Sequence, residues 1–326
     1  EIAVESGGYG AHVGGANSGV VRQTLRTGGS EFGGNVRFES GDYGYNDMTA
    51  TIGGPLGPVK FFAALRQTHT DDWNPSFYES FDIDVDGDGT VDDLPSFEAG
   101  VTPDGDTIQV SFDGSAIPHR AQDKFQLNST ASMDFGPLNL RFTGVVDNAT
   151  WQSNSLPIYY MFNTDRLSEG ERNLTMIATR VNFFLNPNFL ITAGFSTMNR
   201  SYESYDGLFG KPGGFEDALM WHDSATVADK MGAEAGANWK TAYTDPTSYY
   251  VGLFPFQRPG DITTGWSKNN RSTLGLDAGI TYQMGDHEIR AGLDMKNYTY
   301  RKYYLSTSAM EQVNRLVATS DDVATF

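Results

Sequence analysis

The chain has 326 residues, no cysteine and a formal net charge of −18 at neutral pH. The lack of cysteine excludes a disulfide framework and thiolate metal sites, and the negative charge opposes binding to nucleic acid or to anionic lipid through a basic patch. No apolar run approaches the ~18 residues that indicate a transmembrane helix, which leaves transmembrane strands open.

Residues 1–32 are rich in glycine and contain one short apolar run around Val20, Val21 and Leu25. The run predicts a short strand, and the glycines on either side predict turns. No strand–helix unit surrounds these glycines, so they do not form a dinucleotide-binding motif.

From Gly33 onward the sequence alternates apolar and polar residues. Val36 and Phe38, for example, alternate with Arg37 and Glu39. A period of two predicts strands with one apolar and one polar face, and hence an all-β, antiparallel fold. The predicted strands lie at roughly 33–42, 46–54, 58–69, 123–135, 138–150, 173–185, 189–203, 271–284 and 287–302.

The connections between these strands alternate in length. The short ones are 53–58, 136–137, 186–188 and 285–286, and the long ones are near 70–122, 151–172, 204–270 and 303–326. Only the connection at 43–45 breaks this alternation, because it is short on the side of the long loops. Structureless loops beyond ~15 residues are rare in a compact soluble sandwich, although its inner face shows the same alternation. Short turns at one end and long loops at the other favour part of a transmembrane β-barrel with long extracellular loops.

The last two strands carry charges of both signs on their polar faces, as a wet lumen allows. Near the end of the last strand, tyrosines cluster at Tyr298, Tyr300, Tyr303 and Tyr304. They predict an aromatic girdle where this strand leaves the bilayer, although tyrosine is also common in strands generally.

The acidic segment 82–93 reads DIDVDGDGTVDD. It matches the start of a calcium loop in two registers, and the one that begins at Asp84 is better because Gly89 then occupies the sixth position. Position 12 is Pro95 in place of glutamate, so a complete helix–loop–helix site is not expected, and Glu98 is a further acidic side chain that can finish the shell. The predicted Ca²⁺ ligands are Asp84, Asp86, Asp88, Thr90, Asp92 and Asp93. The alternative is a solvated acidic loop tip.

The segment 7–37 reads GGYGAHVGGANSGVVRQTLRTGGSEFGGNVR. It resembles the junction between plug and barrel in TonB-dependent outer-membrane receptors, in particular the Oar-like and SusC-like branch. The matching positions are Gly8, Tyr9, Ala11, Gly14, Ser18, Gly19, Val20, Val21, Thr24, Arg26, Gly29, Ser30, Phe32 and Gly34.

The resemblance implies that residues 1–32 are the end of a plug domain and that residues 33–326 are a barrel segment. Receptors of this family have twenty-two strands and the sequence predicts nine, so we expect an internal fragment of a longer chain. The first residues do not read as a leader, so we expect either that a leader has been removed or that the sequence is an internal piece.

The resemblance also implies a function. It predicts active uptake of a small solute, peptide or glycan across the bacterial outer membrane, with the lipid bilayer and the energy-coupling TonB protein as partners. The alternative is a calcium-stabilised structural or adhesive barrel that docks a surface lipoprotein. The plug-like segment argues against a passive porin.

An enzyme is the least favoured class, because the five histidines are scattered and no nucleophile motif is present. The aromatic residues of the long loops and strand ends are weak candidates for ligand contacts, so the ligand-binding residues stay unknown. These aromatics are Trp73, Phe77, Tyr78, Trp151, Tyr159, Tyr160, Trp221, Tyr249, Tyr250 and Trp266.

Overall fold

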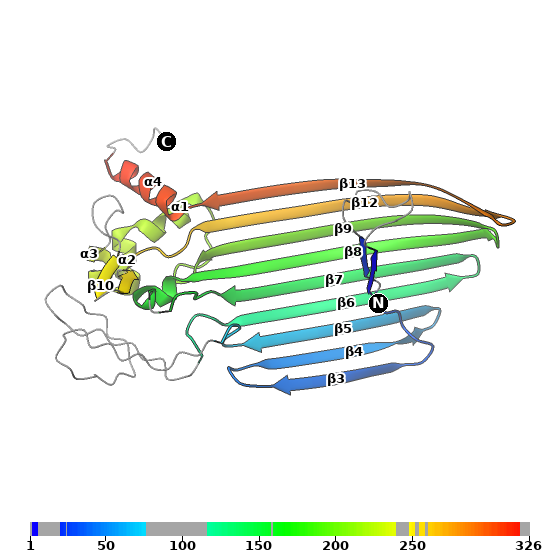
Figure 1. The fold of residues 1–326 in the computed structure, drawn as a ribbon, viewed down its shortest axis with the longest axis horizontal. Helices are drawn as coiled ribbons and strands as arrows, with labels where there is room; N and C mark the ends of the chain where they lie inside the picture. Colours follow the sequence, from blue (N-terminus) through cyan, green and yellow to red (C-terminus); the bar gives the residue numbers. More distant parts are fainter. Residues whose placement is uncertain are drawn as a thin grey trace.

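The computed structural model describes residues 2–5, 20–23, 25–75, 116–157, 159–238, 248–251, 254–257 and 260–319. Its main feature is a nine-stranded antiparallel sheet in which each strand pairs with its neighbour in sequence, apart from the small elements between β9 and β12 (Figure 1). The strands are β3 (Gly33–Ser40), β4 (Asn46–Leu56), β5 (Val59–Thr70), β6 (Gln122–Phe135), β7 (Leu138–Gln152), β8 (Ser168–Asn186), β9 (Phe189–Asp206), β12 (Trp266–Met284) and β13 (His287–Leu305).

The predicted antiparallel fold is confirmed, with longer strands than the alternation alone suggested. β8 and β12 begin at Ser168 and Trp266, before the predicted starts at 173 and 271. Apart from Trp266, these extra residues are polar or glycine on both faces, so they lack the period-two signal on which the prediction relied.

The short connections at 53–58, 136–137, 186–188 and 285–286 lie at one end of the sheet, whereas the short turn between β3 and β4, residues 41–45, lies at the other end (Figure 1). Three of them place a glycine at a φ near +60°, namely Gly57, Gly136 and Gly285. A positive φ at the first of two turn residues only is the pattern of a type II′ turn, which suits hairpins because its twist matches that of the strands.

The other end carries a small group of helices and a hairpin, which we call the cap (Figure 1). Its elements are η1 (Met161–Arg166), α1 (Phe215–Leu219), η2 (Met220–His222), α2 (Ser224–Met231), α3 (Ala233–Asn238), β10 (Ser248–Val251), β11 (Phe254–Gln257) and α4 (Thr307–Thr319). Among the described helices, none combines the length and the apolar run needed to cross a bilayer. A separate hairpin of β1 (Ile2–Glu5) and β2 (Val20–Gln23) precedes the sheet.

The two faces of the sheet differ in chemistry. Residues directly opposite each other in neighbouring strands share a face. One row of such residues passes through Arg141, Arg180, Gly194, Asp277 and Asp294. The next row, on the opposite face, passes through Phe142, Thr179, Phe195, Leu276 and Met295. We call the first the inner face, because residues 25–28 contact it, and the second the outer face.

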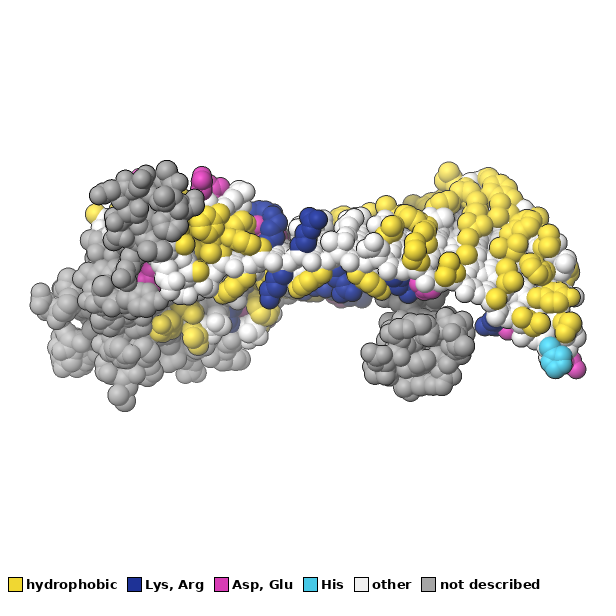
Figure 2. Space-filling view, turned by 90° about the horizontal axis from the view of Figure 1, so that it is seen from above, with side chains coloured by type: hydrophobic (Ala, Val, Ile, Leu, Met, Phe, Trp, Pro, Cys, Tyr) yellow, Lys and Arg dark blue, Asp and Glu magenta, His cyan; other side chains and the backbone are white. Residues whose placement is uncertain are grey.

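Away from the cap, no layer of the described residues covers the outer face. Its hydrophobic side chains gather over the half of the sheet that carries the short turns (Figure 2). Leu276 and Ile280 leave 42% and 43% of their surface exposed, and at the two edges Val36 and Leu293 leave 74% and 73%. A buried core lies instead under the cap, where Ala218, Trp221, Trp266, Leu305 and Met310 pack together.

The predicted aromatic girdle is wrong for three of its four residues. Tyr298, Tyr300 and Tyr304 occupy even positions of β13, as Asp294 does, and so lie on the inner face. Tyr303 alone lies on the outer face. The prediction grouped neighbouring tyrosines without applying the alternation of a strand.

Candidate functional site: the inner face and the cap

Residues 25–28, which we call the anchor segment, are held against the inner face. Arg141 donates from Nη2 to the carbonyl of Leu25 at 2.6 Å, and the hydroxyl of Thr130 donates to the carbonyl of Arg26 at 2.6 Å. Gly28 lies so close to the backbone of Phe61 that any side chain would collide with it. Three strands, β5, β6 and β7, therefore fix the segment that leads from β2 into the sheet.

Ion pairs cover much of the inner face. Asp47 is buried and accepts from Arg66 at 2.6 Å, Thr68 at 2.7 Å and Thr49 at 3.2 Å. The other pairs are more exposed and join Asp147 to Arg172, Asp277 to Arg180, and Asp294 to Lys296. Exposed pairs contribute about 0–1 kcal/mol each, so these residues make the face wet rather than strongly stabilise it.

A groove of about 700 Å³ runs along the inner face beside the anchor segment. Leu25 lines it on one side, and Arg141, Arg180, Ser196 and Asp277 line it from the sheet. Because Val145 and Met176 also line it, the groove is a space of mixed polar and apolar lining between the anchored N-terminal segment and the wall.

Nearer the cap, the inner face carries two arginines directly opposite each other, Arg200 on β9 and Arg271 on β12. The guanidinium of Arg271 lies 5.8 Å from the ring centre of Tyr298, and Asn269 donates to the Tyr300 hydroxyl at 3.0 Å. Like charges directly opposite each other destabilise a pair of strands, so this arrangement favours an anion between them.

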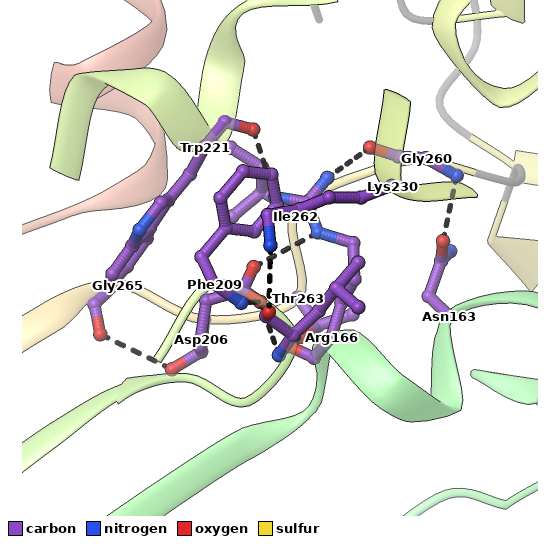
Figure 3. A network of polar contacts seen from close by, with 12 residues as sticks. Asn163, Arg166, Asp206, Phe209, Trp221, Lys230, Gly260, Ile262, Thr263 and Gly265 are labelled. Atoms are coloured by element: carbon purple, nitrogen blue, oxygen red, sulfur yellow. Dashed lines mark hydrogen bonds and ion pairs between the residues drawn. The ribbon is translucent and has the colours of Figure 1, made fainter. Parts of the chain in front are cut away.

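Arg166 is the centre of the cap (Figure 3). Its side chain is fully buried and donates to Asp206 Oδ2 at 2.9 Å, to the carbonyl of Trp221 at 2.8 Å and to the carbonyl of Gly260. One face of the guanidinium lies 5.0 Å from the ring centre of Phe209. A single side chain thus ties η1 to the end of β9, to η2 and to the segment before β12.

Two ionisable groups of the cap have shifted pKa values. Burial lowers the pKa of His222 from 6.5 to about 3, and the nearby charge of Arg166 acts in the same direction. A hydrogen bond with the backbone of Thr307 at the start of α4 opposes the shift. Burial raises the pKa of Asp206, while the charge of Arg166 opposes that rise.

The two ends of the long connection between β5 and β6 are joined by buried polar groups. Asp72 accepts from the backbone of Asn74 at 2.9 Å and of Ile117 at 3.1 Å. Arg120 donates to the carbonyl of Asn154 at 2.7 Å and to that of Asn74 at 2.7 Å. Residues 72–74 and 117–120, on either side of segment 76–115, are therefore held together by buried hydrogen bonds.

The predicted calcium ligands lie in that connection, outside the described residues. They are Asp84, Asp86, Asp88, Thr90, Asp92 and Asp93. Within the described ranges, no three acidic or histidine side chains are grouped to hold a metal ion.

Several of the candidate aromatic residues have packing roles. Trp221 lies in the core of the cap, and Trp266 donates to Glu203 at 2.9 Å. Trp151 packs on Tyr202 with ring centres 5.4 Å apart. Phe77 and Tyr78 lie outside the described residues. Sequence reasoning did not single out Arg166, Asp206, Arg200 or Arg271, because isolated charges in strands and loops carry no motif.

A scan against protein-family models and a search of curated proteins gave no match. A search of solved structures gave matches at low identity. The copper transporter OprC is 13% identical with a TM-score of 0.49, and the match covers 94% of this chain and 37% of that one. The pyoverdine outer membrane receptor FpvA from Pseudomonas aeruginosa PAO1, bound to pyoverdine, is 14% identical with a TM-score of 0.37, covering 94% and 47%.

A crystal structure of the ferripyoverdine receptor of the outer membrane of Pseudomonas aeruginosa is 15% identical with a TM-score of 0.35, covering 93% of this chain and 42% of that one. The chain thus spans less than half the length of each of these structures. All three TM-scores are below 0.5, so these structures assign no function to this chain.

Replacing Arg166 by methionine should destabilise the cap by about 3–5 kcal/mol, because the carboxylate of Asp206 is left buried without its charged partner. The double variant Arg166→Met/Asp206→Leu should recover at least half of that loss, as measured by hydrogen exchange of the cap amides. Arg180→Met, which breaks an exposed pair with Asp277, is the matched control and should cost under about 1 kcal/mol. A double variant no more stable than the single one would contradict this role.

The cap should lose stability as the pH falls from about 6.5 towards 3. His222 stays neutral in the folded cap down to its pKa of about 3, whereas the unfolded chain takes up the proton near 6.5. At pH 5 the loss should be about 2 kcal/mol. His222→Gln should flatten this pH dependence of protease resistance, and His287→Gln, at an exposed turn, should not. Equal slopes for all three proteins would refute the assignment.

Proposed function

We propose that this chain is part of a TonB-dependent outer-membrane receptor that takes up an anionic solute through a plugged barrel. The supporting observation is the two-faced sheet, which exposes a continuous apolar band on one side and ion pairs, arginines and an anchored N-terminal segment on the other. An uncovered apolar surface of this extent requires a hydrophobic environment.

The apolar band has the dimensions of a membrane strand. On β12 the outer-face positions from Leu274 to Met284 are all apolar or aromatic. At ~3.3 Å per residue and a tilt of about 40°, this run spans about 25 Å of height, which is the height of the apolar band of a transmembrane barrel.

The upper limit of the band also runs obliquely across the sheet. The continuous apolar run of the outer face ends, on the cap side, at Leu65 on β5 and at Met295 on β13. The row of paired residues that starts at Leu65 passes through Leu127, Val146, Thr175, Asn199 and Ser272 and arrives at Thr299, beyond Met295. The band is therefore inclined to the row, as it is when strands tilt relative to the membrane plane.

The two edge strands need partners in lipid. β3 and β13 each have one unpaired edge among the described strands. Unpaired backbone groups cost several kcal/mol each in hydrocarbon, so only a closed barrel is stable there. We infer that further strands pair with both edges and complete the barrel.

The N-terminal segment supports the assignment of residues 1–32 to the end of a plug domain and of residues 33–326 to the barrel segment. The anchor segment binds the inner face and β3 begins at Gly33, so the chain passes from the lumen into the wall at this point. In such a receptor TonB pulls on the plug to open a path along the wall.

The facing pair Arg200 and Arg271, with the neighbouring Tyr298 and Tyr300, favours a solute with anionic groups, such as a metal chelate. The proposal requires no covalent chemistry and assigns no catalytic residue. The adhesive barrel that docks a surface lipoprotein remains the second candidate, and the uptake experiment below separates the two.

Spin labels at Leu276 and Ile280 should be quenched by a lipid-soluble reagent, because their side chains lie on the outer face within the band. Labels at Asp277 and Thr281, the next residues along β12, should respond to a water-soluble reagent instead. The reverse pattern would show that the band packs inside the protein, and would end the membrane proposal.

Cells that express the full-length protein should accumulate at least one member of a panel of radiolabelled ferric and cupric chelates, and accumulation should stop when TonB is deleted. Arg200→Glu should lower uptake at least about tenfold, since losing a charge-assisted contact costs roughly 1.5–3 kcal/mol. Arg290→Glu, at the turn end of the inner face, is the control. A lipoprotein complex that persists without TonB, with no accumulation of any chelate, would favour the adhesive barrel.

We also propose Ca²⁺ binding by the 82–93 segment, on the strength of its aspartate spacing alone. Chelation should then increase protease cleavage within residues 76–115 of the folded protein. Asp84→Asn/Asp86→Asn/Asp88→Asn should make cleavage insensitive to calcium, whereas Asp134→Asn at the β6–β7 turn should not. Identical cleavage patterns with and without chelator would show that the 82–93 segment does not bind Ca²⁺.

A further inference from the structure

Above the apolar band, the outer face changes to short hydrogen-bonding side chains. One row crosses four strands through Thr175, Asn199, Ser272 and Thr299. With Asn270 and Arg301 of the same face, these residues line a shallow groove of about 560 Å³. Because amide and hydroxyl side chains line this groove, it is suited to contact polar groups, whereas the apolar band beside it is suited to contact hydrocarbon.

The groove has the depth of a lipid headgroup layer. From Ser272 to Asn270, the β12 residues of the groove advance about 7 Å at ~3.3 Å per residue, or about 5 Å in height at a tilt of about 40°. The headgroup region adds roughly 5–8 Å to each side of a hydrocarbon core. If the band lies in hydrocarbon, the side chains of the groove therefore lie among headgroups.

Of the three arginines that line the groove, Arg200, Arg271 and Arg301, the alternation of the strands places only Arg301 on the outer face. Lys211 pairs with Glu171 and, at 3.0 Å, with Glu203, and Lys268 approaches Glu203 at 3.7 Å. The two carboxylates are thus matched by two lysines. Arg301 is exposed, lies directly opposite Asn270 and forms no ion pair with the described part of the chain.

We propose that this groove binds the phosphorylated sugar headgroup of a lipid whose acyl chains lie on the apolar band below. A guanidinium binds phosphate through two parallel hydrogen bonds, and amide and hydroxyl side chains both donate to and accept from sugar hydroxyls. The row spans four strands, about 14 Å at ~4.8 Å per strand, which is wider than a single phosphate and comparable to a disaccharide. The inference rests on the membrane placement of the proposed function.

The test uses the full-length protein in nanodiscs of phosphatidylcholine that contain a minor fraction of a diphosphorylated diglucosamine lipid. Lipid that stays bound after partial removal of the bilayer is counted by native mass spectrometry. Arg301→Glu should lower retention of the phosphorylated glycolipid about tenfold, the loss expected for one charge-assisted phosphate contact. Lys302→Glu, the next residue along β13 and on the inner face, should leave retention unchanged.

Two further arms identify the ligand. The dephosphorylated glycolipid should bind more weakly than the phosphorylated one, and 10 mM inorganic phosphate, a concentration chosen to be about tenfold above a millimolar site, should not displace it. Displacement by phosphate, or equal retention in the Arg301→Glu and Lys302→Glu variants, would overturn the inference. Quenching of a label at Leu276 by the lipid-soluble reagent in the same nanodiscs shows whether such a failure belongs to the groove or to the membrane placement.

Discussion

In the proposed membrane placement, every strand must find its backbone hydrogen-bond partners in another strand, and this constraint accounts for the form of the sheet. It requires a continuous ladder, which the nine-stranded sheet provides from β3 to β13 without a crossover. Because side chains alternate along each strand, the same ladder separates an apolar outer face from a charged inner face. The short turns follow as well, since tight hairpins join such strands with little chain outside the sheet.

The inner face combines weak and strong interactions in different places. Its ion pairs are mostly exposed and keep the wall hydrated. The bonds from Thr130 and Arg141 to the anchor segment use the backbone carbonyls of Leu25 and Arg26, so they hold this segment whatever its side chains are. Strong, fully buried polar contacts are concentrated in the cap around Arg166, where they join parts of the chain that are distant in sequence.

The sequence predicts the sheet well because alternation and turn chemistry are local signals. Val36 and Phe38 already indicate their face, and Gly136 with Pro137 already indicates a turn. The cap was not predicted, because it depends on the contact of Arg166 with Asp206 across 40 residues of sequence, and neither residue belongs to a motif. The tyrosine girdle failed for a different reason: the strand's alternation, which was available in the sequence, was not applied to Tyr298, Tyr300 and Tyr304.

The candidate solute site, like the cap, depends on contacts between residues that are distant in sequence. Arg200 and Arg271 are seen to face each other only when the register of β9 and β12 is known. That register depends on the structure of the long connection between the two strands, which the sequence does not predict. The calcium segment is the opposite case, since its aspartates form a recognisable spacing within one short stretch of sequence.

The strands do not rise equally far beyond the apolar band. On β12 the chain continues from Ser272 to Trp266 before the ladder ends, whereas on β5 it continues only from Gln67 to Thr70. The described sheet therefore extends unequally far beyond the apolar band: farther at the strands that carry the cap, and less far toward β4. In the proposed receptor, a solute that approaches the barrel from the cap side would therefore cross a lower wall near β4 and β5 than near β12.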